Sequence, residues 1–147
     1  MTAREPTLAD SFQIRPMLEQ DLPVLLHQSH DIEGGDERDA AWFMHPARST
    51  LVLTYEGKII GHTAWSRHLG YTLWDQTYLA PEFRGQGLAR FLMETRAEKT
   101  PGLVFGGSSS ENQAMNHLLE TMGFHICQRA PGKIDLVWAR DHSWEHR

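Results

Sequence analysis

The sequence predicts an α+β domain with a mixed, mostly antiparallel sheet. Residues 49–79 contain three apolar, β-branched runs separated by turn residues, which is the pattern of an antiparallel meander. Two segments with helical spacing follow, and repeated strand–helix–strand units are missing. A chain of 147 residues, 40% of them hydrophobic, suits one packed domain, so we predict a single domain over residues 1–147. Residues 1–10 and 141–147 are expected to be flexible tails.

The first third of the chain predicts a strand followed by two helices. Residues 12–17 alternate weakly between apolar and polar side chains, and residues 19–29 place leucines on one helical face. A short helix is expected at residues 40–45, because Pro46 disfavours its continuation. The polar, acidic stretch at residues 30–39 is interpreted as a flexible lid.

The rest of the chain predicts two helices and three strands. After Pro81 the apolar residues follow helical spacing, and this helix is expected to end near Pro101. Residues 103–108 predict a short buried strand. Residues 124–130 and 133–140 predict two final strands joined by a turn.

The second of these helices has the clearest helical pattern. Ser110 and Gln113 have the spacing of a capping box, and Gly123 is a C-terminal stop. One apolar face is formed by Met115, Leu118, Leu119 and Met122.

The composition argues against several classes of protein. A net charge of −5 opposes broad binding to nucleic-acid phosphates. No segment approaches the roughly 18 apolar residues of a membrane-spanning helix. Residues 1–10 lack the apolar core of a secretory signal, and a lone cysteine, Cys127, cannot form an internal disulfide. We therefore predict a cytoplasmic protein without nucleic-acid or membrane partners, with Cys127 in the core.

Metal binding is not predicted, although the chain has nine histidines. His142 and His146 have the i, i+4 spacing of a helical ligand pair, but no cysteine or third ligand lies near them in the sequence. We interpret them as part of a solvated tail.

The segment that carries chemistry runs from a strand through a proline turn into a helix. Gly85 and Gly87 leave backbone N–H groups uncovered, and the start of the helix adds unpaired donors and the positive end of its dipole. This arrangement suits a diphosphate. Arg84 and Arg90 are candidates for charge-assisted contacts to the phosphates.

A tight connection without a ligand is the simpler interpretation of these glycines. A P-loop is excluded, because Leu88 stands where that motif has lysine. A dinucleotide-binding fold would need repeated strand–helix–strand units.

Two segments together resemble the GNAT acetyltransferases. The sequence RGQGLA at residues 84–89 matches every specified position of their acetyl-CoA signature, Q/R-x-x-G-x-G/A. Asn112, Met115 and the Gly123-Phe124 ending are similar to the second signature of that family. The resemblance covers residues 12 to 140 and implies a GNAT-like sheet of about six to seven strands with about four helices.

The resemblance also implies a site. The strand at residues 71–79 would splay away from its neighbour and form the cleft for coenzyme A, with acetyl-CoA as cosubstrate. Asn112 would contact the cofactor arm, and a backbone donor near Leu79 would stabilise the oxyanion. The diphosphate would be held by the backbone N–H groups of Gly85, Gln86, Gly87, Leu88 and Ala89.

The sequence departs from the family pattern at the general acid. Many members have a tyrosine seven residues after the asparagine, and this chain has Leu119 there. Leucine has no proton to donate, so no acid is assigned, and the nearby serines 108–110 are interpreted as capping and loop residues. Asp75 is the candidate base; the alternative is a structural or substrate-orienting carboxylate.

The acceptor pocket has weaker candidates. Acidic lid residues and aromatic residues would together favour a cationic acceptor, although such residues are more often solvated or core. His62 and His68 are interpreted as exposed or satisfied polar residues rather than catalysts. The candidates are Asp31, Glu33, Asp36, Glu37, Asp39, Trp42, Trp65 and Trp74.

The predicted function is direct transfer of an acetyl group from acetyl-CoA to a primary amine of a small molecule. A protein N-terminus or lysine side chain is the alternative acceptor, and a non-catalytic acyl-CoA sensor is the alternative class. A toxin acting on charged tRNA is disfavoured by the lack of a basic surface. A homodimer is expected from the two terminal strands.

Overall fold

The computed structural model describes residues 11–32 and 38–141. Both predicted tails, apart from Asp141, and five residues of the predicted lid lie outside the described residues. The elements of the described chain follow the order expected from the sequence.

Seven strands form one sheet in the described chain: β1 (Phe12–Pro16), β2 (Arg48–Tyr55), β3 (Lys58–His68), β4 (Tyr71–Leu79), β5 (Val104–Ser108), β6 (His125–Arg129) and β7 (Leu136–Arg140). The α-helices are α2 (Leu22–His30), α3 (Ala40–Phe43), α4 (Leu88–Lys99) and α5 (Gln113–Thr121), and the 3-10 helices are η1 (Glu19–Asp21) and η2 (Pro81–Phe83).

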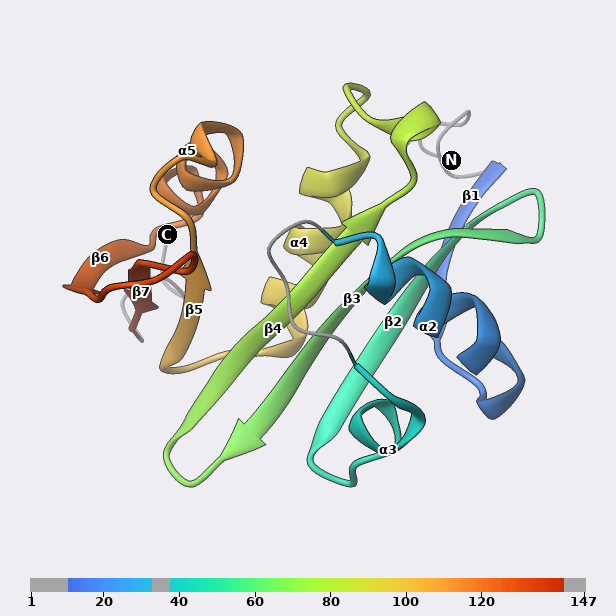
Figure 1. The fold of residues 1–147 in the computed structure, drawn as a ribbon, viewed down its shortest axis with the longest axis horizontal. Coiled ribbons are helices and arrows are strands. Elements are labelled where there is room, and N and C mark those ends of the chain that lie inside the picture. Colours follow the sequence, from blue (N-terminus) through green and yellow to red (C-terminus); the bar gives the residue numbers. More distant parts are fainter. Residues whose placement is uncertain (1–10, 33–37, 142–147) are drawn as a thin grey trace, which may run out of the picture.

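The strand order is β1-β2-β3-β4-β5-β7-β6 (Figure 1). Every neighbouring pair is antiparallel except β4 and β5, which are parallel. The fold is therefore the mixed, mostly antiparallel α+β architecture that the sequence predicts. α4 provides the crossover that a parallel pair requires.

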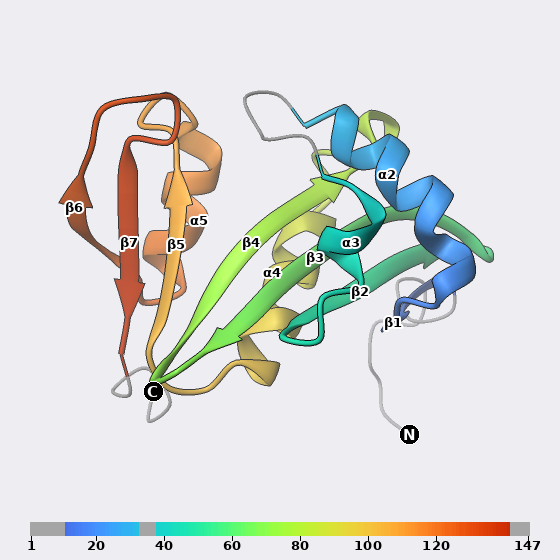
Figure 2. The same ribbon diagram turned by 60° about the horizontal axis from the view of Figure 1, so that its bottom comes forward.

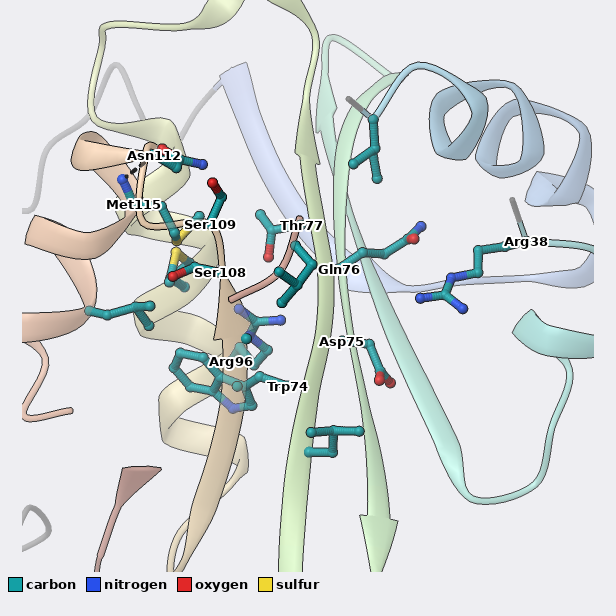
Figure 3. A pocket seen from close by; sticks show the side chains of 17 residues that line it. Arg38, Trp74, Asp75, Gln76, Thr77, Arg96, Ser108, Ser109, Asn112 and Met115 are labelled. Atoms are coloured by element: carbon teal, nitrogen blue, oxygen red, sulfur yellow. Dashed lines mark hydrogen bonds between the residues drawn. The ribbon is translucent and has the colours of Figure 1, made fainter. Parts of the chain in front are cut away.

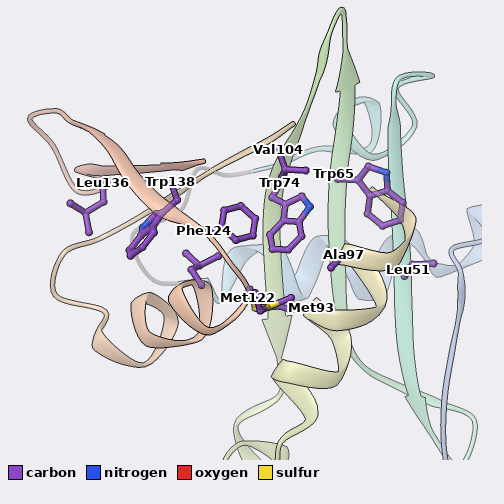
Figure 4. Close-up of a cluster of buried hydrophobic side chains, with 11 residues drawn as sticks. Leu51, Trp65, Trp74, Met93, Ala97, Val104, Met122, Phe124, Leu136 and Trp138 are labelled. Atoms are coloured by element: carbon purple, nitrogen blue, oxygen red, sulfur yellow. The ribbon is translucent and has the colours of Figure 1, made fainter. Parts of the chain in front are cut away.

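Helices cover both faces of the sheet. The apolar sides of α4 and α5 meet β-strand residues in one cluster, in which Trp74, Met93 and Trp138 are buried (Figure 4). On the opposite face, α2 and α3 pack Leu25 and Phe43 against the sheet. Burial of these side chains provides the main driving force for the fold. Within the described chain, no helix has the length and apolar character needed to cross a membrane.

Two local predictions were wrong. The N-cap of α5 is Asn112, whose side chain accepts from Met115 N, because both the backbone N–H and the hydroxyl of Ser110 bind Asp135 at 2.7 Å. Cys127 is exposed rather than in the core. It lies on β6, an edge strand with all five residues exposed, so the alternation of an apolar strand does not bury it here.

Candidate active site

A cleft opens where β4 and β5 separate. The two strands pair only between residues 72–74 and 104–106, and beyond this point they diverge (Figure 2). The gap holds a cavity of about 400 Å³. Residues from β4, β5, α4 and α5 line it, including Asp75, Gln76, Thr77, Arg96, Ser108, Asn112 and Leu119 (Figure 3). The strand at residues 71–79 was expected to splay away from its neighbour, and β4 does so.

The glycine turn precedes α4. Gly85 and Gly87 have φ angles of 83° and 84°, in the left-handed region that favours glycine. A Cβ atom built on either glycine meets no heavy atom within 4 Å, so the turn faces open space. Gly87 caps α4 without a side-chain hydrogen bond, and residues 84–87 are exposed. The first N–H groups of α4 have no intrahelical acceptor and add donors to the turn. The residues therefore fit a diphosphate group.

The two arginines beside the turn have different partners. Arg84 donates from Nε to the carbonyl of Leu79 at 2.8 Å, which ties the turn to the end of β4. Arg90 donates to Glu94 at 3.2 Å and to Thr121 of α5 at 2.8 Å. Its guanidinium is therefore held along the helix surface and not over the glycine turn.

The backbone of Leu79 faces the cleft side of β4. Ala80 N–H donates to Ile60 O of β3 at 2.8 Å, and successive residues of an antiparallel strand direct their polar groups to opposite sides. The N–H and C=O of Leu79 therefore point away from β3. The bond from Arg84 to this carbonyl agrees with that direction.

A β-bulge shapes the middle of β4. Between Trp74 and Thr77 this strand has one residue more than β3, so Asp75 and Gln76 share a single partner, Ala64. The side chains of both residues consequently reach the α2–α3 side of the sheet, whereas Trp74 lies in the cluster under α4.

Asp75 lies at the wall of the cleft in an ion pair. Its Oδ2 accepts from Arg48 Nε at 3.1 Å, and the two side chains are 7% and 14% exposed. Arg48 also donates to the carbonyl of Trp42 and lies 3.8 Å over its indole ring. The second oxygen of Asp75 accepts no hydrogen bond from a described residue, which leaves it available to a ligand of the cleft.

Gln76 belongs to a buried polar network. Its Nε2 donates to Ser29 at 3.0 Å and to His62 Nε2 at 2.8 Å, so the proton of the imidazole lies on Nδ1 and is donated to Gln28 at 2.8 Å. His62 is fully buried, and burial lowers its pKa to about 3. It is a satisfied polar residue, as predicted, and the network joins α2 to the cleft wall.

Arg96 of α4 forms the floor of the cleft, and sequence reasoning missed it. Its side chain is 3% exposed, stacks 4.0 Å over the indole of Trp74 and donates from Nη1 to Ala64 O at 3.0 Å. Burial lowers the pKa of Arg96 to about 9, while the charge of Asp75 raises it. The sequence did contain one indication of its burial, because Arg96 lies on the apolar face of an amphipathic helix.

The general acid position holds Leu119, which is 3% exposed and lines the cleft. Ser108 donates to Asn116 at 2.6 Å and accepts from Trp138, and Ser109 accepts from the backbone of Glu111. Ser109 is a loop residue, as predicted, whereas Ser108 lies at the end of β5, and both hydroxyls are hydrogen-bonded within the protein.

The acceptor-pocket candidates are only partly brought together. Trp65 is a core residue, whereas Trp74 belongs to the core cluster and also lines the cleft. Asp39 caps α3, and Asp31 lies 3.8 Å from His27. The guanidinium groups of Arg38 and Arg48 lie 4.5 and 3.8 Å from the centre of the Trp42 ring. The other predicted acidic lid residues, Glu33, Asp36 and Glu37, lie outside the described residues. Among the residues that the structure describes, no group of three or more metal-ligating side chains occurs.

Comparison with known proteins identifies the family. Residues 13–124 match the acetyltransferase (GNAT) family, so the chain belongs to that family. This confirms the prediction of an acetyl-CoA-dependent acetyltransferase. A search of curated protein sequences found no match.

The fold agrees with solved structures. The ribosomal-protein-S18-alanine N-acetyltransferase of Escherichia coli has a TM-score of 0.74 and 18% identity, covering 88% of this chain and 93% of that one. PaiA N-acetyltransferase of Thermoplasma acidophilum, in complex with coenzyme A, has a TM-score of 0.68 and 12% identity, covering 89% and 99%. A spermidine N-acetyltransferase chimera from Vibrio cholerae and hSSAT has a TM-score of 0.69 and 17% identity, covering 93% and 99%.

Proposed function

We propose that this protein transfers the acetyl group of acetyl-CoA directly to the primary amine of a small molecule in the cleft between β4 and β5. The observation that carries the proposal is the splay of these strands beside the glycine turn. The splay leaves a cavity of about 400 Å³ between the strands, and the turn that follows β4 in the chain presents uncovered backbone donors. A cavity of this size suits a compact acceptor.

The residues that bind acetyl-CoA, the acetyl donor, are those of the glycine turn and its surroundings. Backbone N–H groups of residues 85–89 hold the diphosphate, Arg84 adds a positive charge beside them, and Asn112 lies at the cleft for the cofactor arm. When bound, acetyl-CoA supplies the thioester whose acetyl group the amine takes. The outward N–H of Leu79 is placed to stabilise negative charge on the carbonyl oxygen.

Asp75 carries the proton chemistry on the acceptor side. A primary amine has a pKa near 10 and is mostly protonated at neutral pH, so it must lose a proton before it can attack. Arg48 holds one oxygen of Asp75, and the other is open to orient the ammonium group and take its proton. Gln76, held by His62 and Ser29, keeps the adjacent wall rigid.

The departing thiolate takes its proton from solvent or from the acceptor. The side chain of Leu119 has no acidic proton, and the hydroxyl of Ser108 already donates a hydrogen bond to Asn116. A coenzyme A thiolate is stable enough to leave without a strong acid, because thiol pKa values lie near 8.5.

Thiol release over a panel of small amines, with wild type and Asp75→Asn, tests this function. We expect turnover with at least one amine and a loss of about 10²-fold or more in Asp75→Asn at pH 7. The loss should shrink toward pH 10, where the amine is already neutral. A loss that stays constant with pH would assign Asp75 a structural role.

The addition of a peptide with a free N-terminus and of a lysine-containing peptide to the panel separates the alternatives. Turnover with a peptide N-terminus or a lysine side chain alone would indicate a protein acceptor, as in the E. coli relative. Saturable acetyl-CoA binding without turnover for any acceptor would indicate a sensor.

Assembly and compartment remain predictions. The exposed edge strand β6 offers unpaired backbone groups for a two-fold contact, and light scattering would measure the proposed homodimer. The exposed thiol of Cys127 suits the reducing cytoplasm.

A further inference from the structure

We propose that Arg96 makes the floor of this cleft a binding site for a carboxylate carried by one of the two ligands. The inference rests on the proposed function and adds a ligand chemistry to it. The carboxylate belongs either to the acyl chain of the donor, as in a dicarboxylic acyl-CoA, or to the acceptor amine, as in an amino acid. Both sources would present the same group to the same guanidinium.

The first argument is the incomplete pairing of Arg96. A guanidinium has five N–H donors, and the hydrogen bond to Ala64 O uses one of them. Nε is buried without a hydrogen-bond partner. The charge of Asp75 acts on Arg96, but Asp75 is paired directly with Arg48, and no described carboxylate lies within ion-pair distance of Arg96. A buried charge with unused hydrogen-bond donors is energetically costly unless a counter-ion binds to it.

The second argument is geometry. Figure 3 shows the guanidinium of Arg96 directed into the gap between β4 and β5, and Arg96 lines the cavity. The bulge in β4 gives Ala64 two partners across the ladder, and Ala64 O accepts from Nη1 of Arg96. Trp74 supports the guanidinium from the other side, with its Nε1 fixed on Thr100 at 3.0 Å. The cation is therefore held rigidly at the floor, where a planar carboxylate can bind it through two parallel hydrogen bonds.

The third argument concerns the surroundings of the guanidinium. The lining of the cavity includes four apolar side chains besides its polar residues: Leu73, Met93, Met115 and Leu119. An apolar wall strengthens a charge pair by excluding water. A neutral acetyl methyl group would leave Arg96 without a directly paired carboxylate, with only the longer-range influence of Asp75.

Isothermal titration tests whether the carboxylate belongs to the acyl donor. Full-length wild type is titrated with acetyl-CoA and with succinyl-CoA, and we expect succinyl-CoA to bind about 10-fold or more tightly if the carboxylate is on the donor. Arg96→Met keeps a long side chain over Trp74 and should remove the preference for succinyl-CoA over acetyl-CoA, which is measured as a ratio within the same variant. Arg67→Met removes an exposed arginine of β3 and is the matched control that should retain the preference.

The acceptor arm uses protein saturated with coenzyme A, titrated with β-alanine and with β-alaninamide. A preference for the free acid that is lost in Arg96→Met would place the carboxylate on the acceptor. Arg96→Lys retains charge without the planar fork and should bind with a reduced preference, which provides a second variant if Arg96→Met does not fold.

The outcomes separate this inference from the proposed function. Absence of a carboxylate preference in both arms of the wild type, or a preference that survives in Arg96→Met, would overturn the carboxylate site. Failure of the wild type to bind acetyl-CoA, succinyl-CoA or coenzyme A would instead overturn the proposed function.

Discussion

Acid should destabilise this fold through one buried histidine. The imidazole of His62 is fully buried between Gln28 and Gln76, and its pKa of about 3 lies well below the ordinary value of 6.5. The unfolded chain therefore binds a proton near pH 6.5 that the folded chain takes up only near pH 3. Between these values the unfolded state binds more protons, so stability is complete above pH 6.5 and falls as the pH is lowered.

The size of the effect follows from proton linkage. One proton bound only by the unfolded state costs about 1.4 kcal/mol per pH unit once the pH is below 6.5. From pH 7.5 to pH 5 the free energy of unfolding should therefore fall by about 2 kcal/mol through His62 alone. The pKa of Asp21 is also lowered, chiefly by its hydrogen bonds from Arg15, so this carboxylate contributes a separate loss at lower pH.

Urea unfolding, followed by tryptophan fluorescence between pH 7.5 and 5, measures this loss. His62→Gln cannot titrate but keeps a donor and an acceptor, so subtraction of its profile isolates the contribution of His62. Parallel profiles for wild type and His62→Gln would refute the reasoning.

Two further predictions concern the sheet. Gly61→Ala should lower the free energy of unfolding by about 1–3 kcal/mol, because its Cβ would lie 2.6 Å from a backbone oxygen of β4. Gly106→Ala is the control and should be tolerated, because the nearest atom to its Cβ is 3.5 Å away. Equal urea midpoints for the two variants would contradict this prediction. Cys127 should react with a thiol reagent in the dilute monomer nearly as fast as in urea, because it is exposed on β6, and slow reaction of the monomer would contradict this. The homodimer proposed through this edge should slow the reaction as the protein concentration rises.

Much of the fold could be predicted from the sequence, because hydrophobic period and turn residues act locally. The β2–β4 meander, the helices α4 and α5 and the glycine turn follow from such patterns. The α5 cap could not be predicted, since the choice between Ser110 and Asn112 depends on Asp135, which is distant in the sequence. Cys127 was misplaced for a related reason, because strand alternation does not reveal that all five residues of β6 are exposed.

The candidate site was predictable only where it depends on the backbone. The turn at residues 84–89 is a local motif, and both of its glycines adopt left-handed conformations. The pairing of Asp75 with Arg48 and the floor position of Arg96 were not predictable, because they depend on a bulge in β4 and on contacts between distant segments.

Isothermal titration with acetyl-CoA and free coenzyme A, using wild type and Gly87→Glu, tests the cofactor site most directly. Gly57→Glu is the matched control, because Gly57 has the same φ of 84° and the same open space but lies in the β2–β3 turn. We predict saturable binding for wild type and Gly57→Glu, and none for Gly87→Glu, whose carboxylate would occupy the diphosphate position. Micromolar affinity retained in folded Gly87→Glu, or no binding by the wild type, would contradict the account.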